Sequence, residues 1–298
     1  MSDDFLNDLF DLGSDNDLKD TTRKFQKAPF GWVGGKAKSL PTLIPILKSH
    51  LCNKWIDVFG GSGIVSLNMP DCPLMVFNDA YSGIVDFYRC LQLGSMTQDL
   101  IHQLGNLRHP LSREEWERCR ATWCETDDPV ERAAKWYYMI RCSVIAKGQC
   151  FGRATNGIPP FKIPKSLEVF ESIHWNIRRF QLENLDFKLI LRDYDSEDAL
   201  FYLDPPYVGT DPGIYKIKFK ESDLREMLSI IGTMKGTVIL SGYDSPLIHS
   251  MHYWTDHTKW SASVYAEPQA YHEENYKADK QNVQTIGISE EHLWIKEA

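Results

Sequence analysis

The end of one predicted strand combines groups that could do chemistry. An apolar run over residues 199–203 is followed directly by Asp204, Pro205, Pro206 and Tyr207. Proline fixes its own φ and favours an extended conformation in the residue before it, so the strand should end at Asp204 with stiff backbone beyond it. A carboxylate, a free prolyl carbonyl and an aromatic face could then surround the exocyclic amino group of a flat base. A strand that merely ends in a Pro-Pro turn would have the same residues.

A glycine-rich turn forms a second candidate, after another short apolar strand. The residues of this turn that could contact a ligand are Asp57, Phe59, Gly60, Gly61 and Gly63. Glycine allows the backbone to approach a ligand closely. Asp79 closes the next strand about 20 residues later, where an acidic residue typically binds ribose hydroxyls. Because the Gly-x-Gly-x-x-Gly pattern is absent, a nucleoside cofactor without phosphates suits the turn better than a dinucleotide. A tight turn and a helix-capping Asp are the alternative interpretation.

Residues 30–36 read Phe-Gly-Trp-Val-Gly-Gly-Lys and resemble a phosphate-binding loop at first sight. The pattern fails because no Ser or Thr follows Lys36 and one glycine is missing at the required spacing. Lys36 opens a predicted helix, where Gly34 and Gly35 could free backbone N–H groups for an anion. The carboxylate of an amino-acid moiety would suit both the amides and the ammonium group. Trp32 could pack on the same ligand or belong to the core.

Helices and strands alternate from residue 28 onward. Apolar positions at helical spacing predict helices at 36–51, 81–93 and 222–231, the last with Ser222 as its N-cap. Short apolar runs predict strands at 55–59, 74–77, 187–191, 199–203 and 237–241, and further strands near 262–266, 284–288 and 292–296. A strand, glycine turn, helix, strand and acid in this order are typical of a Rossmann-like sheet, so we predict an α/β fold.

Residues 94–180 differ in character, because aromatic and cationic side chains alternate there. Between 105 and 180 there are thirteen Lys and Arg residues against nine Asp and Glu residues, a local charge of +4 in a chain whose net charge is −8. This segment favours contact with nucleic-acid phosphates, although solvated surface cations would give the same count. The opposite charge is concentrated at residues 1–20, where seven Asp residues and one Lys give −6.

Composition excludes several other classes of protein. No run approaches the roughly 20 apolar residues of a membrane span, and the acidic start is unlike a signal peptide. The seven cysteines are scattered without a Cys-x-x-Cys pair, which predicts reduced thiols and no zinc site of that kind. His249, His252 and His257 are close in sequence, but no second ligand cluster accompanies them, so we predict no metal site.

Five motifs occur in one order along the chain, at residues 30–36, 57–63, 78–79, 184–187 and 204–207. In this order they resemble the Dam-like DNA adenine methyltransferases, which use S-adenosylmethionine. The resemblance covers residues 28–90 and 180–245. Residues 290–295 look like the terminal strand of that family, although the Arg or Thr often found just before it is missing.

The resemblance implies a Rossmann-like methyltransferase fold with a mainly helical target-recognition insertion. The expected organisation is an acidic tail at 1–24, a catalytic domain at 25–93 and 181–298, and the insertion at 94–180. Target-base residues would be Asp204, Pro205, Pro206 and Tyr207. Cofactor-binding residues would be Trp32, Gly34, Gly35, Lys36, Asp57, Phe59, Gly60, Gly61, Gly63, Asp79, Asp186, Phe187 and Asp204. DNA-binding residues would be Arg141, Lys147, Arg153 and Lys162.

The resulting expectation is a cytoplasmic enzyme of phage or bacterial origin, monomeric or weakly dimeric. It would methylate the exocyclic amino group of adenine in double-stranded DNA, as in restriction-modification. Three alternatives remain at this stage. Cytosine methylation uses the same chemistry but more often has Ser in place of Asp204, and methylation of RNA or of a protein glutamine commonly has Asn there. A catalytically silent DNA-binding protein or DNA mimic is the third.

Overall fold

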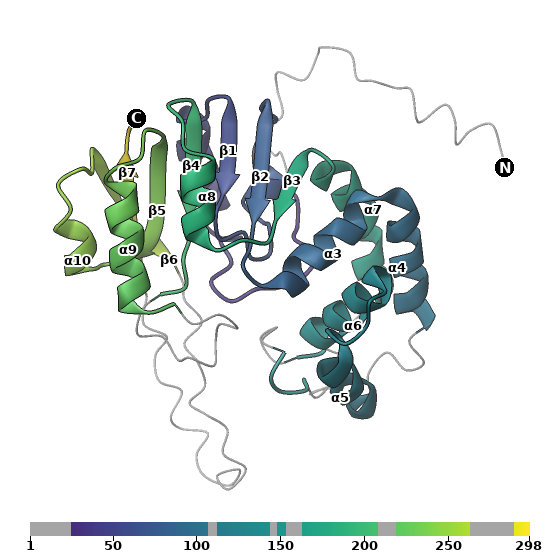
Figure 1. Cartoon of the computed structure of the whole chain (residues 1–298). Coiled ribbons are helices and arrows are strands. Elements are labelled where there is room, and N and C mark those ends of the chain that lie inside the picture. Colours follow the sequence, from purple (N-terminus) through teal and green to yellow (C-terminus); the bar gives the residue numbers. More distant parts are fainter. Residues whose placement is uncertain (1–24, 107–111, 144–147, 153–162, 208–218, 263–288) are drawn as a thin grey trace, which may run out of the picture.

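The structure, a computed structural model, describes residues 25–106, 112–143, 148–152, 163–207, 219–262 and 289–298 (Figure 1). These residues form a seven-stranded sheet in the order β3-β2-β1-β4-β5-β7-β6. The strands are β1 (Lys54–Asp57), β2 (Leu74–Asn78), β3 (Phe180–Glu183), β4 (Ala199–Leu203), β5 (Thr237–Tyr243), β6 (Asp256–Ala262) and β7 (Ser289–Lys296). Neighbours from β3 to β5 run parallel, whereas β7 is antiparallel to both β5 and β6. The predicted α/β class is thus confirmed.

The strand order places a switch point between β1 and β4. Successive strands run outward from β1 through β2 to β3 on one side, and from β4 to β5 on the other. In open parallel sheets the crevice at such a point, outside the carboxyl ends of the strands, is where ligands bind. The carboxyl ends of β1 and β4 carry Asp57 and Asp204, two of the residues predicted to do chemistry.

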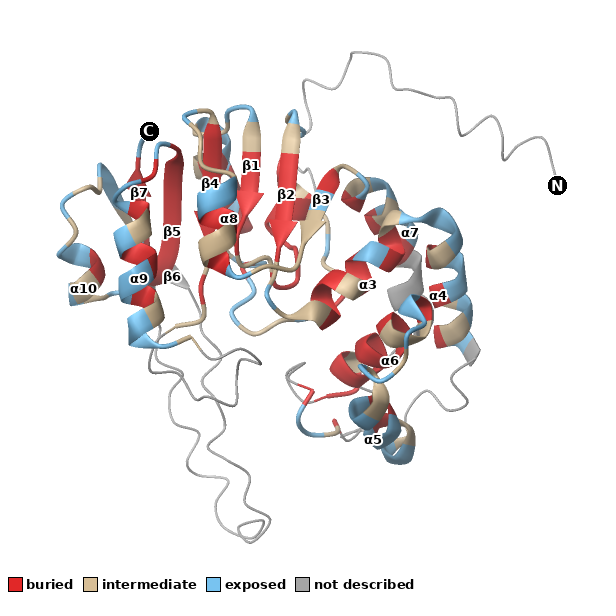
Figure 2. Cartoon of the chain, viewed as in Figure 1, coloured by how far each residue is buried: buried red, intermediate tan, exposed pale blue. Residues whose placement is uncertain are grey.

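Helices cover both faces of the sheet. Figure 1 shows α8 (Phe187–Asp193), α9 (Glu221–Ile231) and α10 (Pro246–His249) on the face that carries Ile56 and Val238. The opposite face carries Trp55 and packs on α2 (Leu40–Ser49) and α3 (Ser82–Gln92). Figure 2 shows that the buried residues follow the strands and the helix faces turned toward them.

A helical cluster lies beyond the β3 edge of the sheet (Figure 1). Its elements are α4 (Gly94–Asn106), α5 (Arg113–Thr122), α6 (Pro129–Arg141) and α7 (Ile163–Ile177). The aromatic residues of this segment are largely core: Trp116, Trp136, Tyr137 and Tyr138 are buried. Trp175, by contrast, is 66% exposed. The buried aromatic side chains therefore belong to the core of the cluster, and in α6 all residues from 133 to 140 are buried.

Three predicted elements differ from the structure. The helix predicted at 36–51 begins only at Leu40, so Lys36 precedes it instead of opening it. Residues 187–191, predicted as a strand, form α8 because the Asp186 carboxylate accepts the Lys188 N–H as an N-cap and apolar side chains recur at helical spacing. The strand in this region is β3 instead. Helix α9 begins at Glu221, and the Lys220 N–H is bound by the Asp223 carboxylate, so Ser222 lies inside the helix.

The C-terminal strands were predicted in part. The predicted strand at 292–296 lies within β7, whereas residues 256–261, for which no strand was predicted, belong to β6. The strands expected near 262–266 and 284–288 lie outside the described residues, apart from residue 262 at the end of β6. In the part of the chain that the structure describes, no helix is long and apolar enough to cross a membrane.

Candidate active site

A cavity of about 230 Å³ opens at the switch point, outside the carboxyl ends of β1 and β4. Every residue predicted to bind cofactor or target base lines it, with the exception of Gly63. These residues come from segments that are far apart in sequence, before α2 and after β1, β2, β3 and β4. The parallel sheet therefore brings four of the five sequence motifs to one place, and the Lys36–Asp204 ion pair joins the segment before α2 to them.

The centre of the site is an ion pair between Lys36 and Asp204. Lys36 is 3% exposed, and its Nζ atom lies 2.8 and 2.7 Å from Asp204 Oδ1 and Oδ2. The same ammonium donates to the Gly34 carbonyl at 3.0 Å and to the Tyr207 hydroxyl at 3.1 Å. Burial alone would lower the pKa of Lys36, but the carboxylates of Asp204 and Glu291 raise it above the ordinary value. Lys36 is thus a cation that holds the Asp204 carboxylate in place.

Three further residues complete this network, and sequence reasoning did not find them. Ser241 on β5 donates its hydroxyl hydrogen to Asp204 Oδ1 at 2.7 Å. Glu291 on β7 is 5% exposed and accepts the Tyr207 hydroxyl hydrogen at 3.1 Å. Tyr243 packs against the Tyr207 ring with centroids 4.2 Å apart. No local signal marked these residues, because Glu291 is flanked by Glu290 and His292 rather than by apolar side chains.

The glycine turn after β1 has a backbone conformation and a close packing that require glycine. Gly61 has a φ of 52° and Gly63 a φ of 70°, both in the left-handed region that favours glycine. Gly60 is restricted by space instead, since a Cβ there would lie 2.2 Å from Phe77. The Gly61 N–H donates to the Asp79 carboxylate at 2.9 Å, which fixes the turn against the end of β2.

Two acidic residues in this cavity have raised pKa values. Burial raises the pKa of Asp79 to about 6, although backbone N–H groups of Tyr81 and Gly61 oppose the shift. Burial also raises the pKa of Asp57 to about 7. Asp57 Oδ2 accepts the Ser66 hydroxyl hydrogen at 2.5 Å, whereas Oδ1 is buried without a hydrogen-bond partner among the described residues. An unpaired carboxylate oxygen that lines a cavity indicates a missing donor or cation.

Aromatic rings form the walls at two ends of the cavity. Phe59 packs on Phe187 and on Phe219, with ring centroids 5.9 Å apart in both pairs. At the other end Trp32 stacks on Tyr81 with centroids 6.1 Å apart. Phe219 was not predicted from the sequence. The Phe59 cluster offers a dry apolar wall that suits a flat heterocycle, with the N-cap residue Asp186 at its edge.

A second cavity of about 590 Å³ shares the residues Pro205, Pro206, Tyr207 and Phe219 with the first. Its remaining wall includes Tyr243 and the segment 244–248. The loop that follows β4 therefore separates two spaces, with the carboxylate of Asp204 in the first of them. Such an arrangement can hold two molecules on either side of one reacting group.

Of the four predicted DNA-binding residues, one lies in the part of the chain that the structure describes. Arg141 ends α6 in the helical cluster, outside the residues that line the first cavity. Lys147, Arg153 and Lys162 lie outside the described residues. The role of these three residues in DNA binding stays a prediction.

Comparison with protein families matches residues 32–279 to the D12 class N6 adenine-specific DNA methyltransferases. The chain belongs to this family. Its match spans both the residues of the first cavity and the helical cluster. Methyltransferases of this family generally use S-adenosylmethionine, which agrees with a site that combines a glycine turn, acidic side chains and apolar rings.

A curated relative shows a shorter likeness. The modification methylase StsI of Streptococcus sanguinis is 31% identical over 72 residues, which is 24% of this chain and 11% of that protein. The match thus spans about a tenth of the relative, and it supports the family without defining the activity of the whole chain.

Proposed function

We propose that this protein transfers a methyl group from S-adenosylmethionine to the exocyclic amino group of adenine in double-stranded DNA. The observation that carries the proposal is the position of Asp204. Its carboxylate lies at the carboxyl end of β4, held by Lys36 and Ser241, in the first cavity and directly before the Pro-Pro-Tyr loop that both cavities share. One cavity has the features of a nucleoside pocket, and the other opens beside the Pro-Pro-Tyr loop.

The first cavity fits the proposed cofactor in chemical character. The unpaired Oδ1 of Asp57 would accept from the ammonium of the methionine moiety, and Asp79 would bind the ribose hydroxyls. Phe59, Phe187 and Phe219 would surround the adenine ring, with Asp186 at the rim. When bound, S-adenosylmethionine supplies a methyl group that a nucleophile can take in a single displacement.

Lys36 has a different proposed role from the one first expected. It was predicted to bind the cofactor carboxylate, yet its described acceptors are Gly34, Asp204 and Tyr207. An ammonium group has three N–H donors, so a bond to the cofactor carboxylate would require an exchange of partners. We assign Lys36 primarily to the positioning of Asp204.

The chemistry of the target amino group explains why a carboxylate is needed. The lone pair of this nitrogen is delocalised into the ring, which makes it a poor nucleophile. Asp204 Oδ2 receives one hydrogen bond from the described residues, so it retains acceptor capacity for an N–H of the base. The Pro205 carbonyl would accept the second N–H. Together these acceptors free the lone pair for the methyl group, and Asp204 takes the proton that the nitrogen loses.

The second cavity is the proposed entrance for the base. A base in duplex DNA must be extruded from the stack, at a cost of a few kcal/mol. Tyr207 would stack on the extruded ring, and Tyr243 would support Tyr207 through their ring contact. Residues 94–180 are proposed as the target-recognition insertion, 25–93 and 181–298 as the catalytic domain, and 1–24 as an acidic tail.

Product analysis tests the proposed reaction directly. Plasmid DNA is incubated with the protein and isotope-labelled S-adenosylmethionine, and the nucleosides are then separated. The expected product is N6-methyladenine. Label in N4-methylcytosine would show that the target is cytosine, and label in RNA alone would show that the substrate is RNA. If no nucleic acid were labelled, a catalytically silent DNA-binding protein would be the better interpretation.

Asp204→Ala tests the role of the carboxylate. The variant should lose on the order of 1,000-fold or more in methyl transfer, because one transition-state contact of this kind contributes about 100- to 1,000-fold and this group also takes the proton. DNA binding, measured by fluorescence anisotropy, should persist. Asp193→Ala at the exposed end of α8 is the matched control and should keep full activity. Wild-type turnover by Asp204→Ala would exclude the mechanism.

A further inference from the structure

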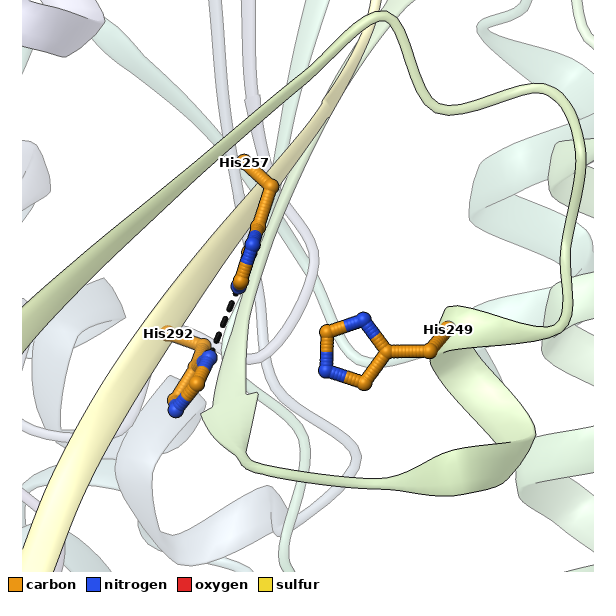
Figure 3. Close-up of side chains that lie close together, drawn as sticks. All are labelled: His249, His257 and His292. Atoms are coloured by element: carbon orange, nitrogen blue, oxygen red, sulfur yellow. Dashed lines mark hydrogen bonds between the residues drawn. The ribbon is translucent and has the colours of Figure 1, made fainter.

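Three histidines from three elements converge on the face of the sheet that α10 covers. His249 ends α10, His257 lies in β6 and His292 lies in β7 (Figure 3). Each offers a ring nitrogen, and these atoms all lie within 4.8 Å of one another. We propose that they bind one divalent transition-metal ion, with zinc as the expected species.

The sheet explains why these residues meet. On the antiparallel pair, His257 stands opposite Trp294 and Lys259 opposite His292. Side chains alternate along β7, so His292 and Trp294 share one face while Glu291 points to the other, where it contacts Tyr207. All three imidazoles pack on the Trp294 indole, with centroids 5.4 to 5.5 Å away. The cluster is thus separate from the proposed catalytic network.

The hydrogen bonds around the cluster suit metal ligation. His257 Nε2 and His292 Nδ1 are 2.7 Å apart, as the dashed line in Figure 3 marks. His292 is 4% exposed, and its Nε2 atom has no hydrogen-bond partner among the described residues. Its ring can therefore carry the proton on Nε2 and leave Nδ1 to bind a metal ion. His249 Nε2 lies 2.6 Å from Asp244 Oδ1. A carboxylate beside a ligating histidine is the usual outer support of a metal site.

Movements of up to about 1.5 Å separate this geometry from a metal site, since the ligand atoms lie within 4.8 Å of one another. Zinc binds imidazole nitrogen at about 2.0–2.1 Å, so two ligand atoms in a tetrahedron are about 3.3 Å apart. The His257–His292 contact would therefore open by about 0.6 Å as the ion replaces the proton between the rings. His257 is exposed, and its ring can adjust.

The ligand set also restricts the choice of metal. Three neutral imidazoles without a thiolate select zinc, copper, nickel or cobalt over calcium and magnesium, which prefer oxygen. The bound ion would join α10 to β6 and β7. It would also fix Asp244, which lines the second cavity, through the bond to His249. The inferred role is structural, at the wall of the space proposed for the target base.

The sequence alone did not lead to this group. It offered His249, His252 and His257, whereas the described cluster contains His292 in place of His252. His292 is 35 residues from His257 and reaches it through strand pairing. This difference supplies a matched control, because His252 is an exposed neighbour outside the cluster.

Metal titration of the full-length protein tests the proposal. The protein is first dialysed against chelator, and Co²⁺ is then added while the visible spectrum is recorded, followed by displacement with Zn²⁺. The expected result is one tightly bound ion per chain with nitrogen and oxygen ligands. His249→Ala and His257→Ala should each weaken binding at least tenfold, and His252→Ala should bind as the wild type does. Asp244→Asn should weaken binding by about 10- to 100-fold as an outer partner.

The thermal midpoint gives an independent measurement. Zn²⁺ should raise it in the wild type and in His252→Ala, but not in His257→Ala, whose circular dichroism without metal reports whether it is folded. Equal binding by wild type and His257→Ala would overturn the proposal. A thiolate-to-cobalt charge-transfer band would assign the ion to cysteines and would also overturn the proposal. Absence of metal binding by the wild type would do the same.

Discussion

The buried Lys36 ammonium contacts two carboxylates, and its removal would deprive both of this cation. Its Nζ atom lies 2.7 Å from Asp204 and 3.6 Å from Glu291. Removing one member of a buried ion pair typically costs about 3–5 kcal/mol. Lys36→Met should therefore lower the free energy of unfolding by about this amount in urea denaturation. Asp204→Asn should cost less, because Lys36 keeps Glu291.

Lys188→Met is the control for that comparison. Lys188 forms an exposed ion pair with Glu226, which water screens, so its loss should change stability little. If Lys36→Met were as stable as the wild type, the ion pairs of Lys36 with Asp204 and Glu291 would not stabilise the fold.

Asp57 adds a pH dependence whose sign follows from its pKa. Burial raises that pKa from 3.8 to about 7, with smaller effects from Asp204 and Asp79, and the Ser66 hydroxyl opposes the shift. The native state keeps this proton up to about pH 7, whereas the unfolded chain releases it near 3.8. The contribution to stability is therefore present at acid pH and is lost as pH rises from about 4 to about 7.

Asp57→Asn removes this titration and isolates its effect. The free energy of unfolding of the wild type minus that of Asp57→Asn should fall steadily across the same pH window, in urea denaturation without cofactor. Other groups titrate in both proteins and cancel in the difference. A constant difference would mean that the Asp57 carboxyl titrates at its ordinary value.

At the scale of elements, the glycine turn after β1 depends on a close approach to β2. A Cβ on Gly60 would lie 2.2 Å from the Phe77 ring, which is itself fully buried. Gly60→Ala should therefore displace the turn and weaken binding of S-adenosylmethionine at least tenfold by calorimetry. Gly105→Ala in α4 is the control, because no atom lies within 4 Å of its added Cβ. That change should leave binding intact and stabilise the helix by about 1 kcal/mol. Equal affinities would show that the turn tolerates a side chain.

The sequence predicted those elements and site residues that depend on local signals. Residues 57–63 and 204–207 are contiguous motifs at strand ends, and a parallel sheet brings strand ends together. The error at residues 187–191 arose because a short apolar run is compatible with either a strand or a helix, and Asp186 as N-cap was the deciding signal. Glu291 and His292 could not be predicted, since their positions depend on β7 pairing between β5 and β6. Ser241 could not be predicted because it reaches Asp204 only through the pairing of β5 with β4.

At the scale of the whole molecule, the count of cations overstates the positive field of the helical cluster. Arg118 pairs with Glu115, Lys135 with Glu131, and Arg132 with Asp86. Arg179 forms a further pair with Asp71. Composition gives the charges but not their partners, so the local value of +4 does not measure the attraction for DNA. Binding should depend instead on cations outside such pairs.

Salt dependence tests whether Lys147, Arg153 and Lys162 bind DNA phosphates. In the proposed DNA complex, the logarithm of affinity falls linearly with the logarithm of salt concentration, by about 0.9 for each phosphate that the protein neutralises. The triple variant Lys147→Ala, Arg153→Ala and Lys162→Ala should weaken binding and reduce that slope by about 0.9 for each phosphate it no longer neutralises, as measured by fluorescence anisotropy. Binding of S-adenosylmethionine should not change. The control, Arg118→Ala with Lys135→Ala, removes paired cations and should keep the wild-type slope. An unchanged slope in the triple variant would place the DNA-binding residues on another surface.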